Sequence, residues 1–437
     1  MPKVNLISLG CPKNLVDSER ILGQLEVNGY QVVDQAHEAD LIIINTCGFI
    51  QEAKEESIET ILNVARLKEE GTCKALIVVG CLAQRYRVEI EKELPEVDLV
   101  LGIDKIPQIT YFCDRILKRR SRTTETWGFR HLMTSPHYAY LRIADGCDNR
   151  CSYCAIPLIR GRQRSRSIEA LYMEARKLVD MGVQELILVA QDTTRYGVDL
   201  YGEPRLVELL TELSKVNGLR WIRLLYTHPA HWNEQLIDLI AENEKICKYV
   251  DVPVQHISDE LLGLMNRKTT KKEVISLIEK LRSRIPGITL RTSVIVGFPG
   301  EEDRHFEELI EFIRDVRFDR LGAFVYSQEE DTPAARFGGQ VPDGAKRERF
   351  QTLMEVQQHI SAELNRSMVG KVLEVLIDER RNGFGFMQPL LIGRAQRDAP
   401  DVDGQVFITA GQASPGEFVD VEITEAYEYD LVGEIAT

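Results

Sequence analysis

The 437-residue sequence has no hydrophobic run long enough to cross a membrane. Its apolar segments, such as residues 41–44 and 75–79, are far shorter than the roughly 20 residues that span a bilayer. The first residues also lack the apolar stretch and the small-residue cleavage site of a secretory signal peptide. From these two absences we expect a soluble, cytoplasmic protein that has no membrane partner.

Positive charge is scarce. The sequence has 54 lysines and arginines against 68 aspartates and glutamates, which leaves a net charge of −14. More than half of this excess lies in residues 368–437, where 13 acidic and 5 basic side chains give a net charge of −8. A nucleic-acid-binding module would supply basic side chains to phosphates. The acidic tail therefore argues against nucleic acid as more than an incidental partner, and it suits a basic protein.

Closely spaced pairs of cysteines are also absent, apart from one group. The nine cysteines are an odd number, which argues against a disulfide framework and for metal or catalytic use. Only Cys147, Cys151 and Cys154 lie close together, with three and two residues between them. Three such thiolates can hold three irons of a 4Fe–4S cube, and no nearby cysteine completes the fourth. A structural zinc site would instead have four ligands, usually in two pairs.

Three different hydrophobic patterns divide the chain, and together they predict an α/β protein. Residues 1–116 alternate apolar strands with helices at 17–28 and 51–70, which indicates an open parallel sheet. Residues 117–136 lose periodicity and indicate a linker. Residues 137–367 hold six more strand–helix units and a long last helix, which predicts an incomplete (βα)6 barrel. Residues 368–437 have the period-2 pattern of a small OB-like β-barrel. The predicted strands of the first two parts are 4–9, 41–45 and 75–79, then 138–144, 185–190, 220–226, 247–252, 288–296 and 320–326.

The predicted N-terminal strands bring a second group of cysteines together. Cys11, Cys47 and Cys81 each lie two residues past the predicted end of an N-terminal strand. Because parallel strands bring their carboxyl ends to one edge of a sheet, we expect these cysteines to meet there. The alternative for each one alone is a small buried apolar residue. Since all three share the same position, we interpret them as the ligands of a second three-thiolate cluster.

These motifs resemble a known enzyme family. The spacing of Cys147, Cys151 and Cys154, with the aromatic Tyr153 before the last, is similar to the radical S-adenosylmethionine superfamily, and residues 293–301 resemble its later cofactor-binding strand end. Two clusters in this order, over the whole chain, resemble the methylthiotransferases. The resemblance implies an N-terminal methylthiotransferase domain (1–116), a linker (117–136), a radical SAM core (137–367) and a C-terminal TRAM domain (368–437).

The resemblance also implies the cofactors, which are two 4Fe–4S clusters and S-adenosylmethionine. Cys11, Cys47 and Cys81 would ligate the auxiliary cluster, which carries the transferred sulfur, and the other triad the cluster that generates the radical. The usual Gly-Gly-Glu segment is missing, and residues 191–194 occupy its place. By position, the candidates for the cofactor pocket are Tyr153, Gln191, Asp192, Gln255, Arg291, Gly297 and Pro299. No catalytic acid or base is assigned.

Several segments resemble the RimO-type branch, which modifies the β-carbon of an aspartate in ribosomal protein S-twelve. Residues 11–14 read Cys-Pro-Lys-Asn, where the tRNA-modifying MiaB-type branch tends to have Gln-Met after the cysteine. Residues 398–404 resemble the branch signature Asp-Ala-Pro-Glu-x-Asp-Gly, with Asp401 in place of glutamate. The acidic tail suits such a basic protein substrate, free or in the small subunit. We therefore predict a docking role for Asp398, Asp401 and Asp403.

Two other functions stay open on the sequence alone. One is a tRNA adenosine methylthiotransferase, which a basic tail would have favoured. The other is an electron carrier or cluster scaffold without enzymatic activity, although such proteins usually complete each cluster with a fourth cysteine. The enzyme that the resemblance implies also needs a low-potential electron donor such as flavodoxin or ferredoxin.

Overall fold

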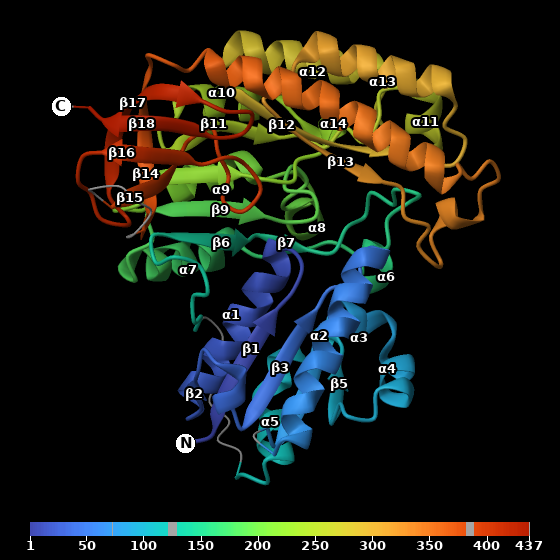
Figure 1. The fold of residues 1–437 in the computed structure, drawn as a ribbon, viewed down its shortest axis with the longest axis vertical. Coiled ribbons are helices and arrows are strands. Elements are labelled where there is room, and N and C mark those ends of the chain that lie inside the picture. Colours follow the sequence, from blue (N-terminus) through green and yellow to red (C-terminus); the bar gives the residue numbers. More distant parts are fainter. Residues whose placement is uncertain (72, 121–128, 382–388, 437) are drawn as a thin grey trace.

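The computed structural model describes residues 1–71, 73–120, 129–381 and 389–436. Figure 1 shows three parts: an N-terminal α/β sheet, a larger central sheet above it, and a small C-terminal barrel at one side of the central sheet. None of the helices in the described residues is both long and apolar enough to cross a membrane.

The N-terminal part is a five-stranded parallel sheet in the order β2-β1-β3-β4-β5. Its central strands are continuous apolar runs because both of their faces are covered by helices. The elements are β1 (Lys3–Ser8), α1 (Pro12–Val27), β2 (Gln31–Val32), η1 (Ala36–Glu38), β3 (Leu41–Thr46), α2 (Gln51–Glu69), β4 (Ala75–Gly80), α3 (Cys81–Arg85), α4 (Arg87–Glu93), β5 (Leu99–Leu101), η2 (Ile103–Gln108) and α5 (Ile109–Ile116).

The central part has six parallel strands in the order β13-β12-β11-β10-β9-β6, and among the described residues no pairing closes this sheet into a full barrel. Its first half contains β6 (Tyr138–Arg142), β7 (Ala144–Asp145), α6 (Ile156–Ile159), β8 (Arg164–Ser165), α7 (Ile168–Asp180), β9 (Glu185–Val189), α8 (Val198–Tyr201), α9 (Leu206–Ser214), β10 (Trp221–Leu224), η3 (Pro229–His231) and α10 (Glu234–Glu242). Its second half contains β11 (Ile246–Asp251), α11 (Asp259–Leu264), α12 (Lys271–Arg284), β12 (Thr289–Val296), α13 (Asp303–Val316), β13 (Arg320–Val325), η4 (Pro333–Arg336) and α14 (Asp343–Arg366).

The two faces of the central sheet are different. One face packs its alternate side chains against the surrounding helices in a large apolar core. The other face carries aromatic and charged side chains, among them Tyr140, Glu185, Arg223 and Tyr249, all of which are buried. This second face is the inside of the incomplete barrel, and polar groups buried there need partners from another part of the chain.

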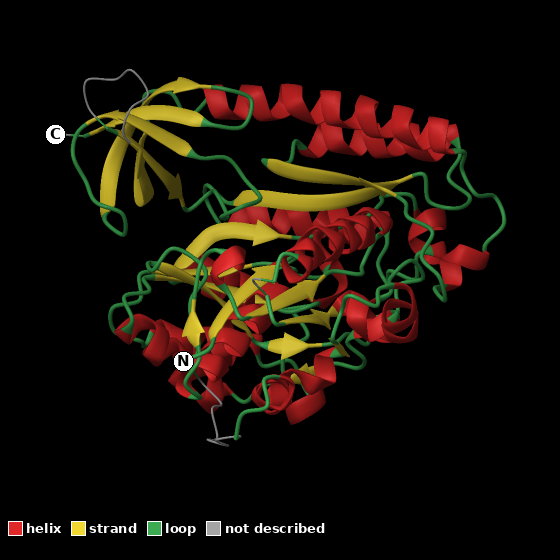
Figure 2. Cartoon of the chain, turned by 60° about the horizontal axis from the view of Figure 1, so that its bottom comes forward, coloured by secondary structure: helices red, strands yellow, loops and turns green. Residues whose placement is uncertain are grey.

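The C-terminal part supplies those partners. It is a closed five-stranded barrel made of β14 (Val372–Arg381), β15 (Leu390–Ala395), β16 (Val406–Ala410), β17 (Phe418–Ala426) and β18 (Leu431–Ile435). Figure 2 shows it at the end of α14, next to the strands of the central sheet. Glu185 of β9, fully buried, accepts hydrogen bonds from Arg223 of β10 at 2.7 Å and from Arg394 of β15 at 2.8 Å. One carboxylate thus joins both domains.

The predicted fold class is confirmed: a parallel N-terminal sheet, six parallel core strands and a small C-terminal barrel are all present. The sequence did not reveal β2 and β5, because strands of two and three residues are too short to show periodicity. Part of the predicted linker, 121–128, lies outside the described residues. Arg130, near its end, is buried and bonds Glu19 of α1 and Glu174 of α7, so this stretch ties the two sheets together.

Candidate functional site

The three N-terminal cysteines lie at one edge of the first sheet. Strand register pairs Ser8 with Asn45 and Thr46 with Gly80, which aligns the ends of β1, β3 and β4. Cys47 and Cys81 follow their strands directly, and Cys11 lies three residues past β1, at the N-terminus of α1. Burial and, in addition, the nearby Cys11 raise the pKa of Cys47 and Cys81, as expected of groups gathered at one place.

Small and polar residues hold this edge together. Gly80 has φ of +101°, and a Cβ there would lie 2.3 Å from Asn45 Oδ1, so only glycine fits. A Cβ on Gly10 would lie 2.9 Å from the sulfur of Cys47. Asn14 of α1 donates to the carbonyl of Thr46 at 2.9 Å, and its Oδ1 accepts from the Cys81 thiol at 3.4 Å.

The second triad lies on the loop after β7. The backbone N–H of Cys147 donates to the carbonyl of Gly161 at 3.1 Å, which anchors the start of the loop. Arg267 donates to the sulfur of Cys151 at 3.7 Å, and it is buried. The backbone N–H of Ser152 donates to the carbonyl of Met265 at 3.0 Å. The segment after α11, which contains Met265 and Arg267, therefore holds the middle of the cysteine loop in place.

The spacing of the two triads is compatible with iron–sulfur ligation and does not suit a single zinc ion. Burial raises the pKa of Cys81 and Cys154 to about 12 and that of Cys147 to about 11, so a bound cation would have to stabilise their thiolates. In the described part of the chain, only Asp192, His228 and His231 bring three metal-ligating atoms within 4.8 Å of one another. Thiolates on a single tetrahedral zinc would lie only about 3.8 Å apart. The wider triads suit a cube whose cysteines bind separate irons.

Residues 155–161 connect the two triads. Cys81 packs against the apolar side chains of this segment in one small cluster. Arg160 donates to the Cys81 sulfur at 3.7 Å, while the next residue, Gly161, holds the backbone of Cys147. The structure thus brings the two predicted cluster sites to the same contact between the N-terminal and central parts.

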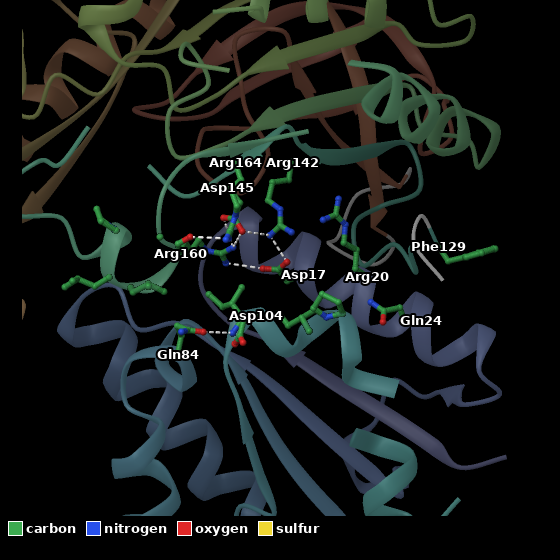
Figure 3. Close-up of a pocket in the computed structure, with 17 residues that line it drawn as sticks. Asp17, Arg20, Gln24, Gln84, Asp104, Phe129, Arg142, Asp145, Arg160 and Arg164 are labelled. Carbon is green, nitrogen blue, oxygen red and sulfur yellow. Dashed lines mark hydrogen bonds and ion pairs between the residues drawn. The ribbon is translucent and has the colours of Figure 1, made fainter. Parts of the chain in front are cut away.

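Ion pairs stabilise this contact. Asp17 of α1 pairs with Arg142 of β6 at 2.6 Å and with Arg160 at 3.1 Å, and Arg160 also pairs with Asp145. Figure 3 shows these four side chains pointing toward one another along the wall of a cavity of about 590 Å³ between α1 and the central domain. Asp17 and Asp145 together neutralise these two arginines of the central domain. The basic stretch 160–166 is tied into the protein here, since Arg166 pairs with Glu174 as well.

A polar cluster lies where β9 and β10 end. Asp192 accepts from Asn149, on the cysteine loop, at 2.7 Å and is 2.8 Å from Nδ1 of His231. Although burial alone would raise it, the bond to His231 helps to lower the pKa of Asp192 to about 2, so this carboxylate stays charged. The Nε2 atom of His228 and the Nε2 atom of Gln191 are buried without a partner among the described residues. These unpaired polar atoms next to the loop of Cys147, Cys151 and Cys154 fit a polar ligand such as S-adenosylmethionine.

Most of the other predicted cofactor-pocket residues also lie at strand ends. Tyr153 packs edge-to-face on Phe298. Gly297, Phe298 and Pro299 are the residues that directly follow β12 in the chain. Gly297 has a φ of +75°, and a Cβ at this position would lie 2.3 Å from the Lys346 side chain, so only glycine fits here. In this conformation the N–H of Gly297 donates to the carboxylate of Glu301. Gln255 follows β11 and has φ of +71°, a conformation that is uncommon outside glycine.

Arg291 differs from the other candidates. It lies in the middle of β12, and its guanidinium pairs with Asp251 at 2.9 Å and with Asp403 of the small barrel at 3.6 Å. Two carboxylates already satisfy it, so the structure does not group Arg291 with the strand-end residues of the predicted cofactor pocket.

The predicted docking residues Asp398 and Asp403 are corrected by the structure, because both face inward. Asp398 is buried and pairs with Arg320 of β13 at 2.6 Å. Asp403 accepts from the hydroxyl of Tyr249 at 2.6 Å, and burial raises its pKa. Only Asp401 is exposed, and it contacts Tyr140. Residues 398–404 therefore cover the inside of the incomplete barrel. The exposed acidic side chains of the small barrel lie on other strands and include Asp420, Glu422, Glu425 and Glu434.

Sequence reasoning missed several residues between the triads. Lys13, next to Cys11, reaches across to Tyr226 at the end of β10, and Asp251 at the end of β11 accepts from the backbone N–H of Tyr226 at 2.9 Å. Burial lowers the pKa of Lys13, and the nearby Cys11 and Asp251 oppose that shift. The one sequence signal for Lys13 is the Pro-Lys pair after Cys11, which on sequence alone only distinguishes the two branches.

Comparison with known proteins covers the same three parts. Residues 3–102 match a family described as Uncharacterized protein family UPF0004, residues 141–313 match the Radical SAM superfamily, and residues 369–436 match the TRAM domain. A ribosomal protein uS12 methylthiotransferase RimO from Desulforamulus reducens is 49% identical over 446 residues, covering 100% of both chains. The protein of that name from Clostridioides difficile is 47% identical over 448 residues, 100% of this chain and 99% of its own.

Solved structures show the same fold at much lower identity. The radical S-adenosylmethionine methyltransferase TsrM from Kitasatospora setae, with cobalamin and a [4Fe-4S] cluster bound, superimposes with a TM-score of 0.56 at 15% identity, over 88% of this chain and 81% of that one. The cobalamin-dependent S-adenosylmethionine radical enzyme OxsB gives a TM-score of 0.52 at 12% identity, over 82% of this chain and 56% of that one.

Proposed function

This chain belongs to the family of ribosomal protein uS12 methylthiotransferases named RimO, and from that premise we propose that it transfers a methylthio group to the β-carbon of an aspartate in uS12, the ribosomal protein S-twelve of the sequence analysis. It is a radical S-adenosylmethionine enzyme, and its cofactors are S-adenosylmethionine and two 4Fe–4S clusters. The alternative of a cluster scaffold without enzymatic activity does not fit this family.

The observation that carries the proposal is the contact of the two cysteine triads through residues 155–161. Methylthio transfer needs a site that generates a carbon radical and a site that holds sulfur, close enough to act on the same side chain. When bound, S-adenosylmethionine and the two clusters supply the radical chemistry and the sulfur. In our proposal Cys147, Cys151 and Cys154 hold the radical cluster, and Cys11, Cys47 and Cys81 hold the auxiliary one.

The chain's own residues bind and position the reactants. Asp192, which already accepts hydrogen bonds from Asn149 and Thr194 and stays charged, would attract the amine of S-adenosylmethionine by its charge. Gln191, Gln255, Gly297 and Pro299 would lie around it, with Tyr153 packed on Phe298. The buried ion pairs of Asp17 with Arg142 and Arg160 hold the two domains in register, which fixes the distance between the triads. No side chain is assigned as a catalytic acid or base.

Replacing Asp192 by asparagine tests its role in the cofactor pocket. We expect the dissociation constant of S-adenosylmethionine to rise about 10- to 100-fold, because a charge-assisted hydrogen bond is worth about 1.5–3 kcal/mol. Equilibrium dialysis with the reconstituted protein measures this constant. Asp148→Asn, on the same loop but paired with the exposed Arg162, is the matched control and should bind normally. Equal affinity in Asp192→Asn would remove Asp192 from the pocket.

The remaining assignments complete the proposal. The domain bounds 1–116, 117–136, 137–367 and 368–437 stay as predicted, and a low-potential donor such as flavodoxin or ferredoxin supplies the electrons. Because its substrate belongs to the ribosome, the enzyme works in the cytoplasm. The acidic exposed strands of the small barrel favour a basic protein over nucleic acid as the bound partner.

The experiment that tests the proposal offers both family substrates to anaerobically reconstituted protein. Ribosomal protein uS12 and unmodified tRNA are incubated separately with S-adenosylmethionine and a low-potential reductant, and both are read by mass spectrometry. We expect a methylthio group on the aspartate-containing peptide of uS12 and none on tRNA. The reverse result would contradict the substrate assignment and leave the two-cluster chemistry in place.

A further inference from the structure

Lys13 occupies an unusual position between the two cysteine triads. It belongs to α1 of the N-terminal domain, two residues after Cys11, and only 7% of the residue is exposed. Its ammonium nitrogen lies 3.3 Å from the ring centroid of Tyr226, at the end of β10 in the central domain. The side chain therefore reaches from the auxiliary triad to the strand ends where the cofactor pocket lies.

The backbone of Tyr226 is fixed in the position that allows this contact. Its φ of +58° is uncommon for a large side chain, and such strained backbone clusters at functional sites. Its N–H donates to Asp251, and its carbonyl accepts from the N–H of Thr193, which follows Asp192. Tyr226 therefore connects the polar cluster at the end of β9 with Asp251 at the end of β11, and Lys13 lies over its ring.

The ammonium of Lys13 has no directly paired carboxylate among the described residues, although Cys11 and Asp251 lie nearby. In the described ranges of the chain, no carboxylate oxygen lies within 4.0 Å of Lys13 Nζ, and no hydrogen bond from this nitrogen is found. The neighbouring arginines differ: Arg142 and Arg160 pair with Asp17, and Arg291 pairs with Asp251. None of the described side chains supplies an acceptor for the three N–H donors of Lys13, so the position can take a carboxylate that arrives from outside.

We propose that Lys13 binds the side-chain carboxylate of the substrate aspartate and thereby selects aspartate between the two triads. This inference rests on the proposed function, which supplies an aspartate as the target. An ammonium has three donors and no acceptor, so it prefers a carboxylate to the neutral amide of asparagine. Held on Lys13, the aspartate has its β-carbon one bond from the fixed carboxylate, within reach of both cluster sites. The tRNA base of the other branch offers no carboxylate to such a lysine.

The test measures binding without turnover, in reconstituted protein without reductant. Isothermal titration calorimetry compares uS12 with a uS12 variant that has asparagine at the target position. The wild-type enzyme is expected to prefer the aspartate form by about 10- to 100-fold, since each factor of ten corresponds to about 1.4 kcal/mol. Lys13→Met should bind both forms with the wild-type affinity for the asparagine form. Lys13→Arg should keep a preference for aspartate.

Controls separate this role from folding and from the proposed function. Lys74→Met, an exposed lysine paired with Asp40 in the same domain, should keep the full preference. Iron content and S-adenosylmethionine affinity are measured for each variant, and Lys13→Gln replaces Lys13→Met as the deciding variant if methionine disturbs the auxiliary cluster. A preference that survives in the neutral variants, or an equal loss for both forms of uS12, overturns the role of Lys13 even if uS12 is methylthiolated. Failure of the wild-type enzyme to bind or modify uS12 overturns the proposed function itself.

Discussion

Replacing Cys47 by serine is expected to abolish methylthio transfer while 5′-deoxyadenosine is still formed, whereas Cys151→Ser is expected to abolish both. Each triad is built by different elements: Cys47 lies at the edge of the N-terminal sheet, and Cys151 lies on the loop held by Arg267. Loss of one ligand should therefore empty one site and leave the other. Iron should fall from about eight to about four atoms per chain in either variant.

The matched control is Cys113→Ser. Cys113 is a residue of α5 that is fully buried in the apolar core of the N-terminal part, and it belongs to neither triad. A hydroxyl there costs about 1–3 kcal/mol of stability, but iron content and both products should be retained. Iron analysis and chromatography of 5′-deoxyadenosine and of the modified peptide measure all three variants. Loss of 5′-deoxyadenosine formation in Cys47→Ser would show that the triads do not form independent sites.

The second large effect concerns the attachment of the small barrel. Glu185→Ala removes the carboxylate that two buried arginines share, Arg223 of the core and Arg394 of the barrel. Breaking such a buried pair by removing one partner typically costs about 3–5 kcal/mol, because Arg223 is left without an anion, whereas Arg394 keeps its pair with Asp378. We expect the free energy of unfolding, measured by chemical denaturation, to fall by that amount. If the chain unfolds in more than one step, the change should be in the step that separates the small barrel from the central domain.

Glu379→Ala is the control for this substitution. Glu379 pairs with Arg381 on the exposed part of β14, where a surface ion pair contributes less than about 1 kcal/mol. Burial alone would raise the pKa of Glu185, but Arg394 and Arg223 hold it below its usual 4.5. A lowered pKa means that this stabilisation is complete above pH 4.5 and is lost as the pH falls further. Equal effects of the two substitutions at neutral pH would contradict the central role of Glu185.

Sequence patterns predicted the elements that depend on local rules. The buried parallel strands are continuous apolar runs, and all nine of the predicted strands are present within a few residues. The positions of the two groups of cysteines could also be predicted, since one group is close in sequence and the other repeats at the ends of neighbouring strands, while their role as cluster ligands stays a prediction. The register of β1, β3 and β4 explains why Cys11, Cys47 and Cys81 share an edge.

What could not be predicted depends on partners that are distant in the chain. Asp398 and Asp403 resemble exposed acidic residues in sequence, but Arg320 and Tyr249 lie on strands of another domain and draw them inward. Lys13 follows a cysteine in a short motif, and only the assembled domains show that its ammonium lies over Tyr226. Charge counts describe a segment as a whole, and they do not tell which carboxylates are already neutralised.

The most direct test of the account uses uS12 with deuterium at the β-carbon of its target aspartate. If both triads act on one side chain that Lys13 holds between them, deuterium should appear in 5′-deoxyadenosine as the methylthio group appears on the aspartate. Mass spectrometry measures both products of the same reaction. Methylthio-aspartate formed together with 5′-deoxyadenosine that contains no deuterium would contradict the account.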